Sequence, residues 1–324
     1  MADIKTRFAG LELCSPVIVS SSGLTDSAEK NRKWADAGAG AVVLKSLFEE
    51  QIHMEAEQYS DPAYAESGDY MAAYVRGHKL AEYLQLIRDT KSVCCIPVIA
   101  SINCFSDSEW VDFAKHIKEA GADALEINIL SLQTDPHAAY GEFEQRHIDI
   151  LRHVKRVVDM PVIMKLGDNL SNPVALIDSL YANGAAAVVL FNRFYPLDID
   201  VDKLTHTTGS VLSTGADLSS PLRWVGIASA RVDRIDYAVS GGVHRPEDVV
   251  KALLAGASAV EVCSAIYAQK EEFIRSSVEY LRKWMDGKGF ERVAQFRAML
   301  NAKEVKGVNM WERTQFLKYF GTKE

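Results

Sequence analysis

Two lysines in the sequence each stand where a short apolar run ends. Lys45 follows residues 41–44 (AVVL), and Lys165 follows residues 161–164 (PVIM). A lysine at the end of a buried strand needs an anionic partner, because an unpaired ammonium group in an apolar interior is very costly. The two residues therefore indicate an anionic ligand. The alternative is a salt bridge from each lysine to an acidic residue at a strand end.

Three asparagines occupy similar positions. Asn103, Asn128 and Asn192 also follow apolar runs. A carboxamide both donates and accepts hydrogen bonds, which suits the edge of a polar, planar ligand. Each asparagine alone is equally compatible with a side chain that only stabilises a turn.

Two glycine- and serine-containing segments indicate a phosphate site. They are Ser240-Gly241-Gly242 and Cys263-Ser264, and each follows an apolar run. Glycine lets the backbone approach an anion closely, and the free N–H groups at a helix start bind phosphate. A lone Gly-Gly pair could simply form a tight turn. Two such segments in the last two structural units are a much more specific pattern.

A repeated joint predicts the elements that position these groups. Small residues around a glycine are followed by an apolar, β-rich run at residues 37–44, 120–127, 183–190 and 255–262. The glycine suits the left-handed end of a helix, and the apolar run suits a strand buried on both faces. Further apolar runs occupy residues 16–20, 97–101, 161–165 and 235–239.

These eight strands, separated mostly by helical stretches, predict an α/β fold, a (β/α)₈ TIM barrel. An open, doubly wound sheet is the alternative. It is less favoured because the phosphate pattern falls in the last two units rather than the first. In such barrels, active sites form at the C-terminal ends of the strands, where the polar residues lie here.

Three segments do not fit the alternation. Residues 4–14 predict a short N-terminal β-hairpin that turns at Ala9-Gly10. Residues 46–80 form a long insertion, which we interpret as an active-site lid. Residues 307–320 predict a C-terminal helical extension on the outside of the barrel. We expect one domain over residues 1–324.

Composition limits the partners and the compartment. The chain has 324 residues, 48% of them hydrophobic and 25% charged, with a net charge of −8. This acidic balance argues against a nucleic-acid partner. We see no long apolar run for a membrane span and no signal-peptide pattern. Five cysteines without a CxxC motif indicate reduced thiols in a cytoplasmic protein, and we expect no metal site.

In order and spacing, these motifs resemble those of the dihydroorotate dehydrogenases, most closely the soluble class 1 enzymes. The resemblance runs from about residue 4 to residue 300 and includes Ser21-Ser22-Gly23, Lys45-Ser46, Glu126-Ile127-Asn128, Lys165-Leu166, Ser240-Gly241-Gly242 and Cys263-Ser264. It implies FMN as cofactor, a small anionic substrate and commonly a homodimer. Carried over by position, the residues that would contact FMN are Ser21, Ser22, Lys45, Asn103, Asn128, Lys165, Phe191, Ser220, Gly241, Gly242, Cys263 and Ser264.

The resemblance also implies a mechanism. Substrate would bind at Lys45, Asn128 and Asn192, next to Arg193. The family's base stands three residues after the strand-end asparagine, which places Ser131 in that role. Proton removal would accompany hydride transfer to flavin N5, with Lys45 and Lys165 as further catalytic residues. An ordinary loop serine is the alternative for Ser131. Replacing Lys165 by alanine is expected to slow flavin reduction and keep the fold.

The chain departs from the family pattern near the substrate. Leu132-Gln133 replaces Pro-Asn after Ser131, residues 65–78 contain no asparagine, and Arg193 replaces a small polar residue. We therefore predict an FMN-dependent dehydrogenase that oxidises dihydroorotate or a related dihydropyrimidine-like anion. Two alternatives stay open: a flavin-free, phosphate-binding isomerase or lyase, and an FMN-binding homologue without turnover. The sequence leaves the electron acceptor open.

Overall fold

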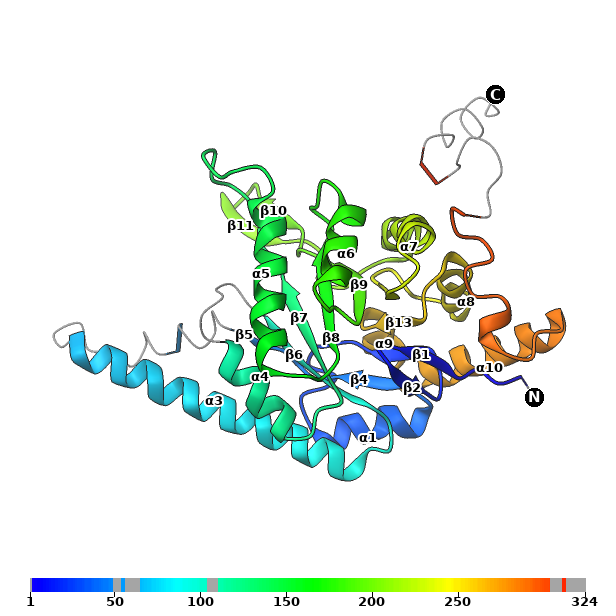
Figure 1. Cartoon of the computed structure of the whole chain (residues 1–324), viewed down its shortest axis with the longest axis horizontal. Coiled ribbons are helices and arrows are strands. Elements are labelled where there is room, and N and C mark those ends of the chain that lie inside the picture. Colours follow the sequence, from blue (N-terminus) through cyan, green and yellow to red (C-terminus); the bar gives the residue numbers. More distant parts are fainter. Residues whose placement is uncertain (1, 49–53, 56–64, 104–109, 304–310, 313–324) are drawn as a thin grey trace.

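Eight parallel strands close into a barrel in a computed structural model of the chain (Figure 1). The structure describes residues 2–48, 54–55, 65–103, 110–303 and 311–312. Around the barrel, each strand pairs with the next and the last pairs with the first. The strands are β3 (Val17–Val19), β4 (Ala41–Val43), β6 (Val98–Asn103), β7 (Ala124–Ile129), β8 (Val162–Gly167), β9 (Ala187–Asn192), β12 (Asp236–Ser240) and β13 (Ala259–Val262). The predicted (β/α)₈ barrel is confirmed, and the open sheet is excluded.

Helices alternate with the strands and surround the barrel (Figure 1). The repeated glycine joint links them to the strands as predicted. Gly38, for example, ends the first helix with φ 103° and donates its N–H to the carbonyl of Ala35. The helices are α1 (Ala28–Ala37), α3 (Ala65–Val93), α4 (Trp110–Glu119), α5 (Glu142–Val157), α6 (Pro173–Ala182), α7 (Ser219–Arg231), α8 (Pro246–Ala255), α9 (Ser264–Gln269) and α10 (Glu271–Lys288). None of them within the described ranges has the length and apolar character needed to cross a membrane.

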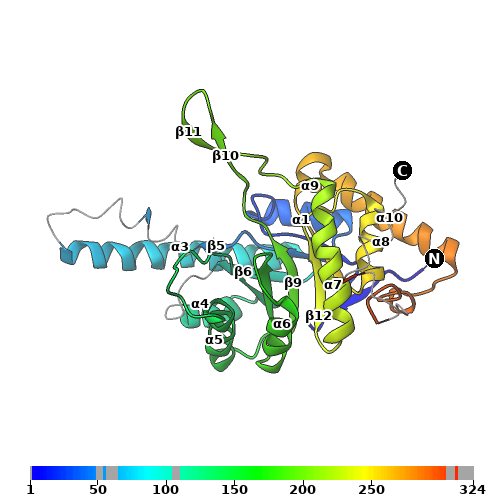
Figure 2. The same ribbon diagram turned by 90° about the horizontal axis from the view of Figure 1, so that it is seen from above.

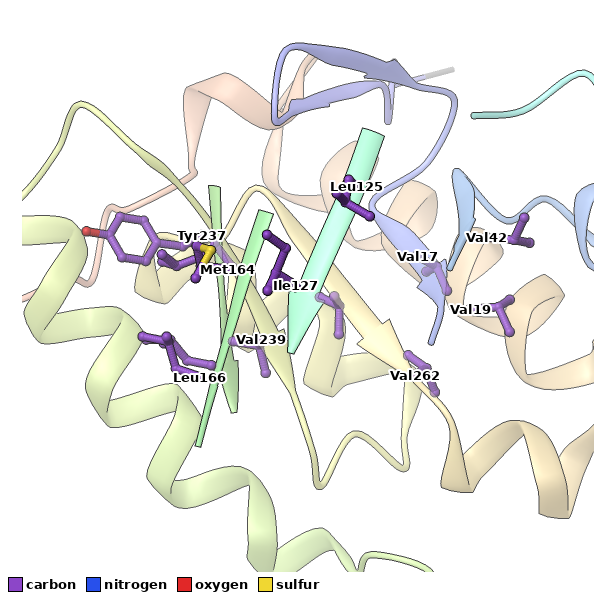
Figure 3. Packing of buried hydrophobic residues seen from close by; sticks show 14 of the residues in the cluster. Val17, Val19, Val42, Leu125, Ile127, Met164, Leu166, Tyr237, Val239 and Val262 are labelled. Atoms are coloured by element: carbon purple, nitrogen blue, oxygen red, sulfur yellow. The ribbon is translucent and has the colours of Figure 1, made fainter. Parts of the chain in front are cut away.

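Successive strand residues alternate between the helices and the barrel interior. Val19, Leu125, Met164 and Val239 belong to the large outer cluster of the core (Figure 3). A second, smaller cluster fills the lower interior, which is the part of the barrel near the N-terminal ends of the strands. Its strand residues are Ile18, Val43, Ile99, Ala124, Ile163, Val189, Ala238 and Ala259.

The predicted N-terminal hairpin closes this lower interior. It consists of β1 (Thr6–Phe8) and β2 (Leu11–Leu13). Phe8 and Leu13 are fully buried against the first inward residues of the strands. The hairpin is tied down because the Thr6 hydroxyl donates to the carbonyl of Ser258, and the Ala9 N–H donates to Asp236. The barrel is therefore plugged at its N-terminal end.

Two residues further along seven of the eight strands, the inward layer changes from apolar to polar, and β9 keeps the apolar Phe191 at this level. Counting on from Ile18, Val43, Ile99, Ala124, Ile163, Ala238 and Ala259 reaches Ser20, Lys45, Ser101, Glu126, Lys165, Ser240 and Glu261. Because the strand period is two, these side chains point to the same side as the apolar plug below them. The strand pattern thus delivers a polar layer to the C-terminal end of the barrel.

Two segments differ from the sequence predictions. A two-stranded hairpin, β10 (Leu197–Asp200) and β11 (Thr205–Thr208), follows β9, was not predicted and projects away from the barrel (Figure 2). The insertion predicted over residues 46–80 is not one loop. Its start forms β5 (Leu47–Phe48), and from Ala65 onward it belongs to the 29-residue helix α3.

Two short 3₁₀ turns complete the description, η1 (Gly215–Leu218) and η2 (Val293–Gln295). The helix predicted over residues 307–320 lies almost entirely outside the described residues.

Candidate active site

A cavity of about 620 Å³ opens at the C-terminal ends of the barrel strands. It collects most of the side chains that the sequence singled out, although they come from different strands. The predicted residues that line it are Ser21, Ser22, Lys45, Lys165, Phe191, Asn192, Arg193, Gly241, Gly242, Cys263 and Ser264. The sequence therefore located the wall of one real cavity.

Glycine is needed for a different structural reason at each of the two glycine positions of the phosphate segment. Both have a positive φ, 96° at Gly241 and 73° at Gly242. A Cβ atom on Gly242 would overlap the backbone nitrogen of Leu218, whereas a Cβ on Gly241 would meet no atom within 4 Å. Gly242 is thus required by packing against η1. Gly241 leaves backbone facing open space, as a cradle for an anion requires.

A loop that the sequence analysis missed packs over the second phosphate segment. The Ser213 N–H donates to the Ser264 hydroxyl at 2.9 Å, and the Ser213 hydroxyl lies 3.0 Å from His244 Nε2. Ser213 also lines the cavity. No motif marks this loop, because only the return of the β10–β11 hairpin brings it to the site.

Ser220 lies in a smaller neighbouring cavity of about 210 Å³. This cavity shares Asn192, Arg193 and Gly241 with the main one. Ser220 stands in the first turn of α7, which continues directly from η1, and the Ser219 N–H donates to the carbonyl of Ala216. Its position beside Gly241 is compatible with the predicted contact to FMN.

Lys165 is held by two buried glutamates. Its Nζ lies 2.6 Å from Glu261 Oε2 and 3.6 Å from Glu126 Oε1, and it donates to the Ser20 hydroxyl at 3.1 Å. The Lys165 side chain is 7% exposed and those of Glu126 and Glu261 are 1% and 0% exposed. The salt bridge that we left open as an alternative for Lys165 is therefore present.

The glutamates were missed as site residues, although a signal existed. Glu126 and Glu261 each interrupt an apolar strand, five residues after the glycine of a repeated joint. A charged residue in such a strand is buried only with a partner. Their equal spacing indicates that both lie at the same level of the barrel, but it does not identify Lys165 as their partner.

The three groups set one another's protonation. Burial raises the pKa of Glu126 well above its usual value, and the neighbouring charge of Glu261 raises it further. Burial also favours neutral Glu261, but the charge of Lys165 and the hydrogen bonds that Lys165 and Ser20 donate outweigh this effect and lower the Glu261 pKa. Burial lowers the Lys165 pKa, but the two carboxyl groups more than offset this and raise it. Glu126 is therefore neutral, Glu261 is ionised and Lys165 is charged.

A chain of serine hydroxyls connects this cluster to the first strand loop. Ser21 Oγ lies 2.9 Å from Ser46 Oγ, which lies 2.8 Å from Ser101 Oγ, and Ser101 donates to Glu126 at 3.5 Å. The hydroxyl of Tyr83 fixes Ser101, since it donates to the Ser101 carbonyl and accepts from its N–H. These hydrogen bonds thus connect Ser21, predicted as a cofactor residue, to Glu126 inside the barrel.

The predicted asparagines are brought together. Asn192 Nδ2 donates to Asn128 Oδ1 at 3.0 Å, and Asn103 pairs with Asn128 in the β6–β7 register. Asn192 lines the main cavity, whereas Asn128 is 6% exposed behind it.

The two cations near the cavity opening, Arg193 and Lys45, differ in their interaction partners. Arg193 Nη2 donates to the carbonyl of Val211 at 2.6 Å, which ties the arginine to the loop after the β10–β11 hairpin. Lys45 is exposed at the cavity wall, and the described residues offer its ammonium group no carboxylate partner within 4.0 Å. Lys45 is thus the cation available to an anionic ligand.

Ser131 lies outside the cavity lining. It is half-buried in the loop after β7, and its hydroxyl accepts a hydrogen bond from Gln133 Nε2 at 3.3 Å. Asn169 Nδ2 donates to the Ser131 carbonyl at 2.9 Å.

These features fit a flavin mononucleotide. The volume lies within the range of ligand cavities, about 300–1,000 Å³. Gly241 provides an open backbone cradle at one side, and Lys165 and Asn192 provide donors at another.

Comparison with known proteins decides the family. A family model described as dihydroorotate dehydrogenase matches residues 3–285. The chain belongs to the dihydroorotate dehydrogenase family. Members of this family are flavin-dependent oxidoreductases, so the predicted family and enzyme class are confirmed.

Individual relatives cover most of the chain. It is 27% identical to the catalytic subunit of dihydroorotate dehydrogenase B (NAD(+)) of Thermoplasma volcanium, over 91% of this chain and 97% of the relative. It is 29% identical to the protein of the same name in Methanosarcina acetivorans, over 82% and 86%. It is 24% identical to the NAD-dependent dihydropyrimidine dehydrogenase subunit PreA of Escherichia coli, over 92% and 77%.

Proposed function

We propose that this oxidoreductase binds FMN in the main cavity and oxidises dihydroorotate or a closely related dihydropyrimidine anion. The observation that carries the proposal is one cavity wall that joins Gly241, Gly242 and Ser264 to Lys165, Asn192 and Lys45. The names of the relatives support a dihydropyrimidine ring as the substrate class.

The FMN phosphate would bind at Gly241, Gly242 and Ser264, with Ser220 beside them. Ser21, Ser22, Asn103, Phe191 and Cys263 would hold the ribityl chain and ring. Lys165 would donate a hydrogen bond to the ring edge. When bound, FMN supplies an acceptor for hydride.

Lys45, Asn128, Asn192 and Arg193 would orient the substrate. Lys45 would attract an anionic group, and the asparagines would fix the ring by hydrogen bonds. Ser131 would remove the proton as general base. A serine hydroxyl has a high intrinsic pKa, so this role requires a hydrogen-bonded acceptor such as an ordered water.

We further propose that residues 1–324 act as one catalytic domain in a cytoplasmic homodimer. Five exposed apolar residues around the β10–β11 hairpin support self-association: Tyr195, Leu197, Ile199, Val201 and Leu204. Sedimentation velocity of the purified chain tests the oligomeric state, and a monomer at working concentration would contradict it.

The test of activity is anaerobic reduction of the FMN-loaded protein by dihydroorotate and by dihydrouracil, which lacks the carboxylate. We expect dihydroorotate to bleach the visible flavin absorption. Lys45→Ala should raise KM for dihydroorotate roughly tenfold or more, equivalent to about 1.4 kcal/mol, and change the response to dihydrouracil little.

Three outcomes would correct the proposal. A protein that takes up no FMN would refute the cofactor. A flavin reduced only by dihydrouracil would show that the substrate is uncharged. An FMN-loaded protein reduced by neither compound would favour the alternative of a binding protein without dihydropyrimidine turnover.

A further inference from the structure

The ammonium group of Lys165 is already partly occupied in the protein. It donates one hydrogen bond to Glu261 at 2.6 Å and another to the Ser20 hydroxyl at 3.1 Å. Ser20 in turn donates to the same Glu261 oxygen at 3.0 Å. Both Lys165 and Glu261 line the cavity, so a ligand there meets this pair as a unit.

The pair of carboxyl groups supplies a single negative charge. Glu126 Oε2 and Glu261 Oε1 are both buried without a hydrogen-bond partner among the described residues, and burial together with the charge of Glu261 raises the pKa of Glu126, which favours a proton on that carboxyl group. Two ionised carboxylates that both lie within 3.6 Å of the Lys165 ammonium group would repel strongly in a buried site. Glu261 lies 1 Å nearer to Lys165 than Glu126 does, so the negative charge belongs on Glu261.

The consequence is electrostatic. A lone lysine would present a full positive charge to the cavity and would stabilise any ligand that gains negative charge there. With Glu261 at 2.6 Å, the cluster has no net charge, and its field falls off much faster. Lys165 can still donate a hydrogen bond but acts only weakly as a charge.

We propose that Glu261 is a positioning residue that fixes Lys165 and offsets its charge, so that the cavity favours oxidised over reduced flavin. This inference deepens the proposed function and rests on FMN being the ligand. It assigns Glu126 the supporting role of a neutral side chain beside the Lys165–Glu261 ion pair. The lower midpoint potential that results would make the reduced cofactor a stronger electron donor to the next acceptor.

Two matched substitutions separate charge from structure. Glu126→Gln replaces a neutral acid by a neutral amide of nearly the same shape. Glu261→Gln removes the nearer carboxylate, and Glu126 can then ionise and act as counter-ion from 3.6 Å. The double variant leaves Lys165 without a counter-ion in this cluster.

The measurement is the midpoint potential of bound FMN, obtained by equilibration with reference dyes, together with FMN affinity. We expect the double variant to bind reduced flavin, relative to oxidised flavin, roughly tenfold more tightly than the wild type, equal to about 30 mV for a two-electron couple. Glu126→Gln should change this ratio less than about threefold, and Glu261→Gln should lie between the two.

The outcomes are distinguishable. A double variant with the wild-type potential, or Glu126→Gln with as large a shift as the double variant, would overturn the inference while leaving the proposed function intact. A purely structural role would weaken oxidised and reduced FMN binding alike, without moving the potential. If the double variant does not fold, the order of the two single variants decides. A wild-type protein that binds no FMN would overturn the proposed function and this inference together.

Discussion

At the level of single residues, Lys45 and Lys165 face the same cavity from different surroundings. Lys45 is exposed, whereas Lys165 is buried between two glutamates and a serine. The two lysines can therefore be replaced separately to distinguish ligand attraction from internal charge pairing.

We predict that Lys165→Ala destabilises the fold, because it leaves the Glu261 carboxylate buried without its nearest counter-ion. Breaking a buried pair from one side costs about 3–5 kcal/mol. This structure-based expectation replaces the earlier one that the variant merely slows flavin reduction. Urea unfolding measures the loss, and Lys45→Ala is the matched control, expected to stay within about 0.5 kcal/mol of the wild type. Equal losses in both variants would refute the assignment.

At the level of elements, one carboxylate joins the phosphate segment to the next helix. Asp248 in the first turn of α8 accepts hydrogen bonds from the N–H groups of His244 and Arg245 and from Lys251 Nζ at 2.7 Å. Burial acts to raise the Asp248 pKa, but these hydrogen bonds and Lys251 outweigh it, so the pKa lies below its usual value of 3.8.

We therefore predict a pH-dependent cost for Asp248→Asn. A depressed pKa in the folded state stabilises the protein above the unfolded value of 3.8, and this contribution disappears as the pH falls through the lower folded value. At pH 7 the variant should be less stable by about 2 kcal/mol. The difference should shrink when urea unfolding is repeated near pH 3. A constant difference would show that ionisation of Asp248 is not the cause.

The N-terminal hairpin gives a second prediction at this scale. Phe8 is fully buried in the lower interior, in the apolar cluster on the N-terminal side of the polar layer. Phe8→Ala should cost about 3–5 kcal/mol of unfolding free energy and leave FMN affinity in the folded protein nearly unchanged. Glu12→Ala on the same hairpin removes only an exposed ion pair and should cost less than about 1 kcal/mol. A large drop in FMN affinity with Phe8→Ala would contradict the separation of plug and site.

Much of the architecture was predictable because its signals are local. The glycine joint recurs four times, and all eight predicted strands are present at their predicted places. The β10–β11 hairpin was missed because β10 (LDID) alternates over only four residues, β11 (THTT) contains no apolar residue, and neither strand belongs to the core.

The site was predictable in its parts and not in its pairings. The residues at strand ends were found, and most line one cavity. The partners of Lys165 were not, because Glu126 and Glu261 are 135 residues apart in the chain (261 minus 126) and meet only when the barrel closes. The same holds for Ser213 and His244, which tertiary packing alone brings together.

At the level of the whole molecule, cofactor binding and folding are linked. A ligand that binds only the folded state stabilises it by about 2.7 kcal/mol at one hundred times its Kd. We predict that FMN raises the melting temperature in a concentration-dependent way and that riboflavin, which lacks the phosphate, raises it much less at equal concentration. Differential scanning fluorimetry in the presence of each compound makes the comparison. Equal stabilisation by both would argue against a phosphate site at Gly241 and Gly242.

The hairpin plug also has a kinetic consequence. With Phe8 and Leu13 closing the N-terminal end, the barrel is a cup with its cavity at the opposite end. Reductant and oxidant must then enter the same cavity through its opening at the C-terminal end of the barrel, and they exclude each other while bound. We expect turnover to alternate between two half-reactions. Initial rates measured against one reactant at several fixed concentrations of the other should give parallel double-reciprocal lines, whereas intersecting lines would show that both reactants are bound at once and would contradict the alternation.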